Sequence, residues 1–294
     1  MILKHRGMLE IHIAVFLFGL AGLFGKWLTL SPMLIVFGRT FFASLVLGAI
    51  LFFSKIPFQA KSRQDLAVLV LLGIILAVHW VTFFHSIQIS TVAVGLLTFS
   101  TFPVFVTFVE PYFFKEKLYF FDILTAGFVL LGLVLVVPSF DFQNNVTQGA
   151  FWGTISGFTF AVLSILNRKY VATYPPMVIV CYQNGIAAIV LFPLVIFQDL
   201  TLQSSDYALL AILGIFCTAL AHVLFIKSLV HIKAQLASII ASLEPVYGIF
   251  FAFMLLGEIP ALRTLLGGGI ILGTITLATM KRKHVESSRI EKGT

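Results

Sequence analysis

Long apolar segments, separated by short polar connections, most constrain what this chain can fold into. A helix that crosses a membrane needs about 20 mostly apolar residues. Hydrophobic residues make up 60% of the 294 residues and charged residues only 11%, whereas soluble domains carry roughly 25% charged residues. The sequence therefore predicts an all-α integral membrane protein and excludes a soluble enzyme, a disordered protein and a nucleic-acid-binding module. Ten segments are long and apolar enough to span: 9–30, 33–54, 66–87, 90–112, 119–138, 148–168, 176–197, 207–229, 234–256 and 260–280.

The distribution of Lys and Arg predicts the orientation of these spans. If the N-terminus is cytoplasmic, sixteen of the 19 Lys and Arg residues fall in inner segments. Lys26 and Arg263 then lie at outer ends, and Arg39 lies inside the second span. Cytoplasmic loops of membrane proteins carry such an excess of basic residues. We therefore expect a multi-pass protein of the cell (inner) membrane with both termini in the cytoplasm and an irregular tail from Lys281.

The chain also matches itself when its first half is laid over its second half with Ser100 on Ser242. Ser100–Pro103 then falls on Ser242–Pro245, and His85 falls on Lys227. We call this displacement the repeat offset. At a slightly larger shift, Ser31–Met33 falls on Pro175–Met177.

Each half would then hold five helices, and an odd number gives the two halves opposite orientations. The predicted units are residues 1–145, residues 146–280 as a second, inverted repeat, and the cytoplasmic tail 281–294. Inverted repeats are typical of secondary transporters, which bind substrate near the midplane between the repeats.

Several motifs resemble the drug/metabolite transporter superfamily, in its EamA branch. Each half has a helix with a Pro, then a turn, then a Gly-rich final helix: Ser242–Glu258 with Leu265–Thr274, and Phe99–Lys117 with Ala126–Gly132. Ser31–Ser44, which contains Arg39, is similar to the second helix of the family. The resemblance implies ten helices in two inverted repeats around a central cavity. It also implies a secondary transporter of amino acids, nucleosides, cofactors or drugs, without choosing among them.

Glu244 is the only acidic residue expected near the middle of the membrane. It lies ten residues into its predicted span, about 15 Å along a helix axis, and Pro245 removes a helix hydrogen bond beside it. A carboxyl group there can bind a substrate ammonium group, exchange a coupling proton, or bond to a neighbouring helix. Glu244 is therefore the candidate for proton coupling as well as for substrate binding.

Other polar and aromatic residues are expected at similar depth. Trp80 and His222 are related by the repeat offset and would face each other across the cavity, although either can instead be structural. Gln183 falls on Arg39 at the slightly larger shift, and Arg39 can bind an anionic group or extend toward the interface. The predicted substrate-binding set is Arg39, Trp80, Phe84, Phe102, Tyr182, Gln183, His222, Phe225, Glu244 and Tyr247.

Two glycine pairs, Gly153–Gly157 and Gly269–Gly273, have the spacing that allows helices to approach closely. Cys181 and Cys217 stand in apolar runs, without a metal-binding pattern, and we interpret them as buried, reduced residues. No cofactor or metal is expected. The expected partners are a small-molecule substrate and the lipid bilayer, with no nucleic acid, and the chain is expected to be a monomer or weak homodimer.

Three functional classes fit a membrane protein of this kind. A secondary transporter of a small metabolite, an amino acid or a related amine or nucleoside-type solute, is favoured, with a multidrug exporter of the same fold as the alternative. A membrane-embedded enzyme is disfavoured because all five Asp residues lie at predicted helix ends or in loops and no HExxH motif occurs. A channel is disfavoured because no connection is long enough to fold back into the membrane. The chain also has no P-loop, so we expect no direct use of ATP.

Overall fold

The computed structural model describes residues 2–114, 120–137, 141–198, 202–232, 237, 240, 241 and 243–292. Within these ranges the secondary structure is helical, with no strand. The helices are α1 (Ile2–Ala21), α2 (Phe24–Trp27), α3 (Pro32–Phe53), α4 (Arg63–Ile89), α5 (Val92–Phe99), α6 (Phe102–Phe114), α7 (Phe120–Val136), α8 (Asn145–Tyr170), α9 (Pro176–Val195), α10 (Ser204–Gly214), the π-helix η1 (Ile215–Leu220), α11 (Ala221–Ser228), α13 (Glu244–Leu256) and α14 (Leu262–Lys292).

Short polar side chains and prolines determine where several of these helices begin. The Ser31 hydroxyl accepts a hydrogen bond from the Leu34 amide, and Pro32 occupies the first turn of α3. Ser62 and Thr91 cap α4 and α5 in the same way. Such caps satisfy amide groups that a helix start leaves unpaired, and Pro costs nothing at a position whose amide is unpaired anyway.

Seven described segments are long and apolar enough to cross a membrane: 6–27, 32–53, 63–89, 92–113, 145–170, 176–195 and 204–228. They fall in seven of the ten expected spans. The other three expected spans hold shorter apolar helices, Ile123–Val136, Glu244–Leu256 and Leu262–Leu277. Large apolar side chains such as Phe52, Phe120 and Phe197 are mostly exposed on the outside of the molecule. Soluble proteins rarely expose so much apolar surface, because its contact with water is unfavourable. These side chains therefore face lipid, and the chain is a multi-pass membrane protein.

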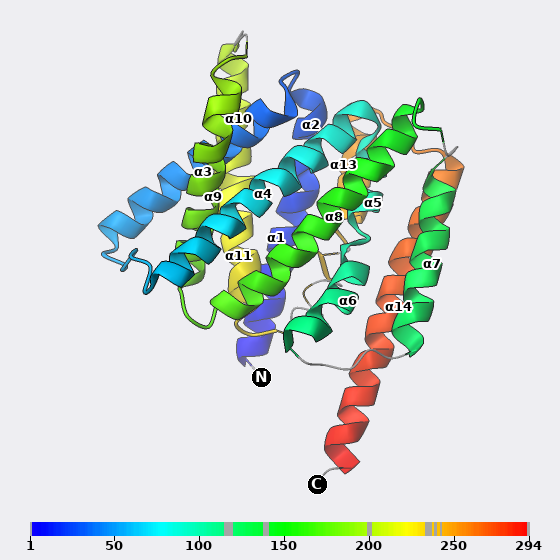
Figure 1. The fold of residues 1–294 in the computed structure, drawn as a ribbon. Coiled ribbons are helices and arrows are strands. Elements are labelled where there is room, and N and C mark those ends of the chain that lie inside the picture. Colours follow the sequence, from blue (N-terminus) through cyan, green and yellow to red (C-terminus); the bar gives the residue numbers. More distant parts are fainter. Residues whose placement is uncertain are drawn as a thin grey trace.

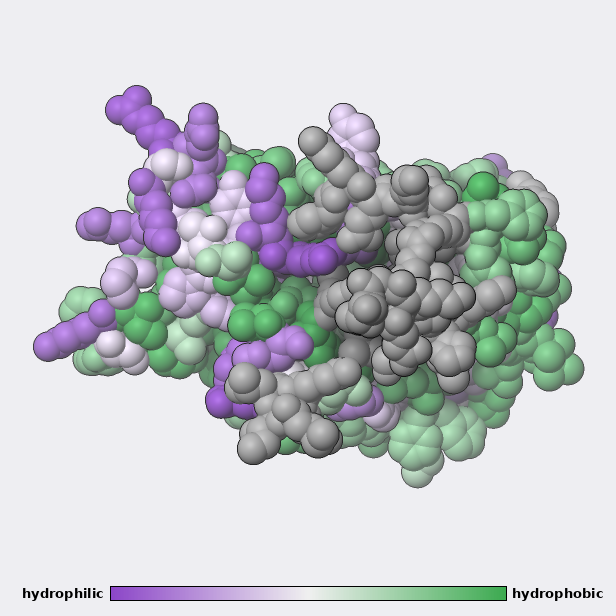
Figure 2. Space-filling model, turned by 90° about the horizontal axis from the view of Figure 1, so that it is seen from below, coloured by the Kyte–Doolittle hydropathy of each residue, from purple (hydrophilic) through white to green (hydrophobic). Residues whose placement is uncertain are grey.

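The helices form one bundle with a separate pair at its side (Figure 1). In the bundle, α4 packs on α8 and α9, α3 on α9 and α10, and α1 on α11 and α13. The separate pair is α7 and α14, which pack chiefly on each other. The start of α1 and the end of α14 lie at the lower end of the molecule (Figure 1). Seen from below, hydrophilic residues gather on the left (Figure 2), the side on which Figure 1 places the α3–α4 connection. The exposed residues of that connection and of the start of α4 include Lys55, Lys61, Arg63 and Gln64.

Two expected spans are interrupted. The fourth is broken at Ser100 and Thr101 into α5 and α6, and the eighth contains η1 between α10 and α11. The helix α6 begins at Phe102 and α13 begins at its counterpart by the repeat offset, Glu244, each with a Pro as its second residue. A Pro has no amide to continue a preceding helix but fits the first turn of a new one.

Two expectations from the sequence are wrong. The tail from Lys281 was expected to be irregular, but α14 continues to Lys292, because residues 281–292 contain no Gly or Pro and several good helix formers. The pair Gly269–Gly273 makes no close helix contact, since a Cβ added at either would meet no atom within 4 Å. Gly267 makes that contact instead, with the backbone of Gly132 on α7. The other expected pair is close: a Cβ at Gly157 would lie 2.7 Å from the Phe99 carbonyl oxygen.

Gly153 provides a test of this packing. A Cβ at Gly153 would overlap the Thr98 hydroxyl on α5, so we expect Gly153→Ala to destabilise the fold by about 1–3 kcal/mol through overpacking. Gly48→Ala on α3 is the matched control, because no atom lies within 4 Å of the added carbon. The apparent melting temperature in detergent should fall only for Gly153→Ala; equal melting of both variants would contradict this packing.

Candidate functional site

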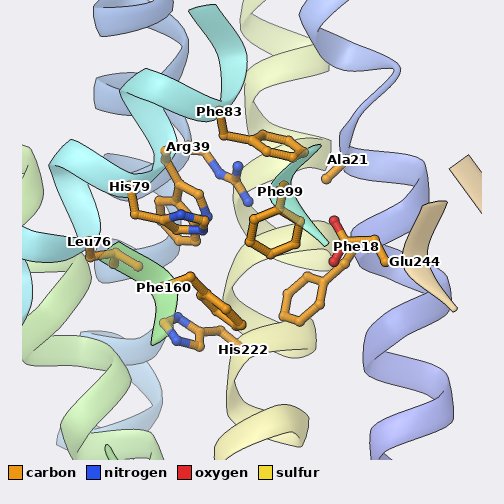
Figure 3. Close-up of a pocket in the computed structure, with 11 residues that line it drawn as sticks. Phe18, Ala21, Arg39, Leu76, His79, Phe83, Phe99, Phe160, His222 and Glu244 are labelled. Atoms are coloured by element: carbon orange, nitrogen blue, oxygen red, sulfur yellow. The ribbon is translucent and has the colours of Figure 1, made fainter. Parts of the chain in front are cut away.

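A cavity lies inside the bundle where α1, α3, α4, α5, α8, α11 and α13 meet (Figure 3). Its volume open to water molecules is about 30 Å³, enough for about two waters. The cavity is therefore small, and most of the side chains around it are buried. The cavity is lined by Phe18, Ala21, Arg39, Leu76, His79, Trp80, Phe83, Phe99, Phe160, His222 and Glu244.

Arg39 is 1% exposed and is held by two helices. Its Nε donates to the Thr218 hydroxyl at 2.8 Å, and one terminal nitrogen donates to the Cys217 carbonyl oxygen at 3.3 Å. The guanidinium carbon lies 3.8 Å from the centre of the Trp80 ring, and the Phe84 ring is 5.3 Å away. Stacking on an aromatic face stabilises a cation that has lost its water. The sequence had left open whether Arg39 extends to the interface; in the structure it points into the cavity wall.

The π-helix η1 provides the groups that hold Arg39. The Thr218 hydroxyl donates to the Leu213 carbonyl oxygen, five residues earlier, at 2.7 Å, and thereby fixes the oxygen that accepts from Arg39. Gly214, directly before η1, lets α3 come close, since a Cβ there would lie 2.8 Å from the Arg39 carbonyl oxygen. Single turns of π-helix inside longer helices frequently occur at functional sites.

Glu244 is the first residue of α13 and is 5% exposed. Its carboxylate makes no hydrogen bond or salt bridge with any residue in the described ranges. Arg39 interacts with it electrostatically across the cavity, and in Figure 3 the Phe99 ring lies between the two side chains. The site thus holds one buried guanidinium group and one buried carboxyl group that form no salt bridge with each other.

The two histidines of the cavity differ in their bonding. Nδ1 of His79 lies 2.9 Å from the Ser156 hydroxyl and 3.0 Å from the Ser156 carbonyl oxygen, which ties α4 to α8. His222 packs edge-on against Trp80 with ring centres 5.8 Å apart. Its Nδ1 is buried, and no partner for it occurs in the part of the chain that is described. His79 therefore has a structural bond that His222 lacks.

Four of the ten predicted binding residues line the cavity together: Arg39, Trp80, His222 and Glu244. Three more form an aromatic layer behind the wall. Phe102 stacks on Phe99 at 5.2 Å, Phe225 packs against Phe18 and Phe160, and Phe84 lies beside Phe83 and Arg39.

The remaining three lie elsewhere. Tyr182 donates a hydrogen bond to the Phe58 carbonyl oxygen and stacks on the Phe58 ring at 4.6 Å, at the α3–α4 connection. Gln183 donates to the Asn167 side-chain oxygen at 2.6 Å, between α9 and α8. Tyr247 packs on Phe16 of α1 with ring centres 5.7 Å apart. These residues fasten helices in this conformation and do not border the cavity.

Seven lining residues are absent from the predicted binding set: Phe18, Ala21, Leu76, His79, Phe83, Phe99 and Phe160. Phe18 and Phe160 are related by the repeat offset, as Trp80 and His222 are. The internal repeat therefore contained the signal for these two phenylalanines. Leu76 and Phe99 have no such mark, since their partners at this offset are Thr218 and Ala241.

Comparison with known proteins places this chain in a family. The sequence profile of the EamA-like transporter family matches it twice, over residues 5–137 and 147–280. The chain belongs to this family. It is therefore a membrane transporter of the drug/metabolite superfamily and not an enzyme, as the sequence predicted.

Individual relatives agree with this assignment. An uncharacterized transporter of Bacillus subtilis, YxxF, is 24% identical over 95% of this chain and 91% of its own length. An S-adenosylmethionine uptake transporter of Rickettsia conorii is 25% identical over 85% of each chain. A solved crystal structure with 15% sequence identity aligns over 95% of this chain and 98% of its own, with a TM-score of 0.68, and shares the fold.

Proposed function

We propose that this protein is a secondary transporter that moves a small metabolite across the cytoplasmic membrane by alternating access. The chain would cross the membrane ten times as two inverted five-helix repeats, residues 1–145 and 146–280, with both termini in the cytoplasm. The cavity around Arg39 and Glu244 would be the substrate site. Coupling would be by exchange or by protons.

The observation that carries this proposal is the pairwise exchange of helix contacts between the two halves. At or close to the repeat offset, α1 corresponds to α8, α3 to α9, α4 to α10 with η1 and α11, α6 to α13, and α7 to α14. The contact of α4 with α8 therefore corresponds to the contact of α11 with α1. Likewise, the contact of α6 with α8 becomes that of α13 with α1, and α4 with α9 becomes α10 with α3. The pairs α3 with α9 and α7 with α14 map onto themselves. Such exchange supports a two-fold axis in the membrane plane, which gives inward-open and outward-open states from one fold.

Contacts at the two ends of the cavity support gating by the same pairs of helices. Lys227, in the last turn of α11, forms a salt bridge with Glu10 of α1, Nζ to Oε1 2.8 Å. Their counterparts by the repeat offset, His85 of α4 and Trp152 of α8, are also in contact, with ring centres 5.4 Å apart. One contact would open while the other stays closed.

The site and the relatives both support a choice of solutes to test. The aromatic wall accepts a flat or apolar group, while Arg39 and Glu244 offer charges for polar ones. Several relatives are named S-adenosylmethionine uptake transporters, and that compound combines an amino acid with a nucleoside. Amino acids and nucleoside derivatives are thus the first solutes to test.

Counterflow in proteoliposomes tests the function directly. Vesicles loaded with an unlabelled amino acid, nucleoside or S-adenosylmethionine should transiently accumulate the labelled compound in chemically unchanged form. Accumulation should saturate with concentration, because the site must reload at each side. Labelled product that is chemically altered would indicate an enzyme, and flux that neither saturates nor responds to internal solute would indicate a pore.

Glu244→Gln separates the roles of the carboxyl group in transport. The amide keeps the shape but removes the charge, so a substrate ammonium group loses its partner and affinity should fall by about tenfold or more in both exchange and net uptake. If Glu244 couples protons instead, pH-driven accumulation should be lost while exchange survives. Wild-type kinetics of the variant at every pH tested would contradict both roles.

Charge reversal tests the contact between α1 and α11. Lys227→Glu places a like charge beside Glu10 and should favour separation of the two helices, lowering counterflow severalfold. Glu10 also binds Arg6 on α1, so the compensating variant combines Glu10→Lys and Lys227→Glu with Arg6→Gln; it restores opposite charges between α1 and α11 and should recover most of the rate. Failure of this combined variant to exceed the Lys227→Glu variant would show that this contact does not control the cycle.

A further inference from the structure

Arg39 has N–H donors for which the described residues provide no acceptor. A guanidinium group carries five N–H donors, and the described residues accept from Nε and from one terminal nitrogen. The remaining nitrogen belongs to a side chain that lines the cavity. The planar group, fixed by Thr218 and Trp80, thus presents an edge that suits a carboxylate.

The Glu244 carboxyl group lacks hydrogen-bond donors in the same way. Its oxygens accept no hydrogen bond from the described part of the chain, although the residue is 5% exposed and borders the same cavity. It is the first residue of α13, directly before Pro245. The carboxyl oxygens border the cavity and have no donor among the described residues, and a substrate ammonium group would supply donors and favour the ionised form.

The two charges are separate, and this arrangement selects the substrate. No salt bridge joins Arg39 to Glu244, yet they interact electrostatically. A purely cationic substrate would leave Arg39 without an oppositely charged partner, and an anionic one would leave Glu244 without one. A neutral nucleoside would compensate neither charge. A zwitterionic molecule pairs with both groups and adds no net charge, so the free-energy cost of closing the loaded site away from water stays low.

We propose that the transported substrate is zwitterionic, with its carboxylate bound by Arg39 and its ammonium group bound by Glu244. This inference rests on the proposed transport function and specifies its substrate. Phe18, Phe99 and Phe160 surround the remainder of the substrate, which is accordingly an apolar or aromatic side chain. Thr218 is a positioning residue, because it holds the guanidinium group through Nε and touches no substrate.

Competition in counterflow tests the assignment of each charge. The probes are the L-amino acids and S-adenosylmethionine, each beside its carboxamide and its N-acetyl derivative. With the wild-type protein, both derivatives should compete about tenfold more weakly than the parent compound, because each loses one charge-assisted contact. Arg39→Gln should abolish the preference for the free carboxylate but keep the preference for the free amine. Glu244→Gln should do the reverse.

Two further variants keep this test decisive. Thr218→Val retains the volume and the Arg39 charge but frees Nε, so the preference for the free carboxylate should fall severalfold even if Arg39→Gln does not fold. Lys169→Gln, on the exposed end of α8, removes a distant positive charge and should change neither preference.

The outcomes distinguish this inference from the function beneath it. If carboxamides or N-acetyl derivatives compete as well as the parent compounds, the proposal of a zwitterionic substrate is wrong. Their transport would still agree with the proposed transport function. Exchange of nucleosides or simple amines without any amino acid would have the same meaning. If none of these solutes exchanges in vesicles that contain folded protein, both proposals fail.

Discussion

A guanidinium group inside a membrane has to replace its water with protein groups, and the centre of this molecule is built around that need. Arg39 leaves α3, is bonded by Thr218 and Cys217 of η1, and is covered by Trp80 of α4. Three segments far apart in the sequence therefore converge on one charge. Gly214 permits this approach, because a side chain there would collide with the backbone of α3. The cavity lies beside Arg39, and the described residues provide acceptors for only two of its three nitrogens.

The helices could be predicted because their determinants are local. Apolar length located the spans, and the caps Ser31 and Ser62, with Pro32, are local features of the sequence as well. The interruptions at Ser100–Thr101 and at η1 were missed, since a break inside an apolar run depends on what packs against it. In η1 the carbonyl of Cys217 is bonded by Arg39, from the other half of the chain. No window along the chain contains that partner.

The site was predicted where chemistry contrasts with its surroundings. A charged or strongly polar residue in an apolar span stands out, which is why Arg39, His222 and Glu244 could be placed at the cavity. Trp80 was added as the counterpart of His222 by the repeat offset. Phenylalanines do not stand out among 32 of them. A helix that is apolar all round has no polar face to show which side meets lipid and which meets the cavity. Tyr182 was misleading for the opposite reason: its hydroxyl reaches a loop carbonyl at Phe58, which only the tertiary fold brings near.

The differences between equivalent positions matter as much as their likeness. By the repeat offset, Phe102 corresponds to Glu244 and Trp80 corresponds to His222. The ring contact of His85 with Trp152 likewise corresponds to the salt bridge of Lys227 with Glu10. Two identical halves would make the inward-open and outward-open states equal in energy, whatever the substrate. A difference between those states can come only from side chains that break the equivalence. In the proposed cycle, an ionic contact at one end and an aromatic contact at the other provide it, because salt and water weaken the first far more than the second. The single acid at Glu244 adds a second asymmetry, since substrate or proton then meets a charged partner from one half of the chain and an aromatic layer from the other.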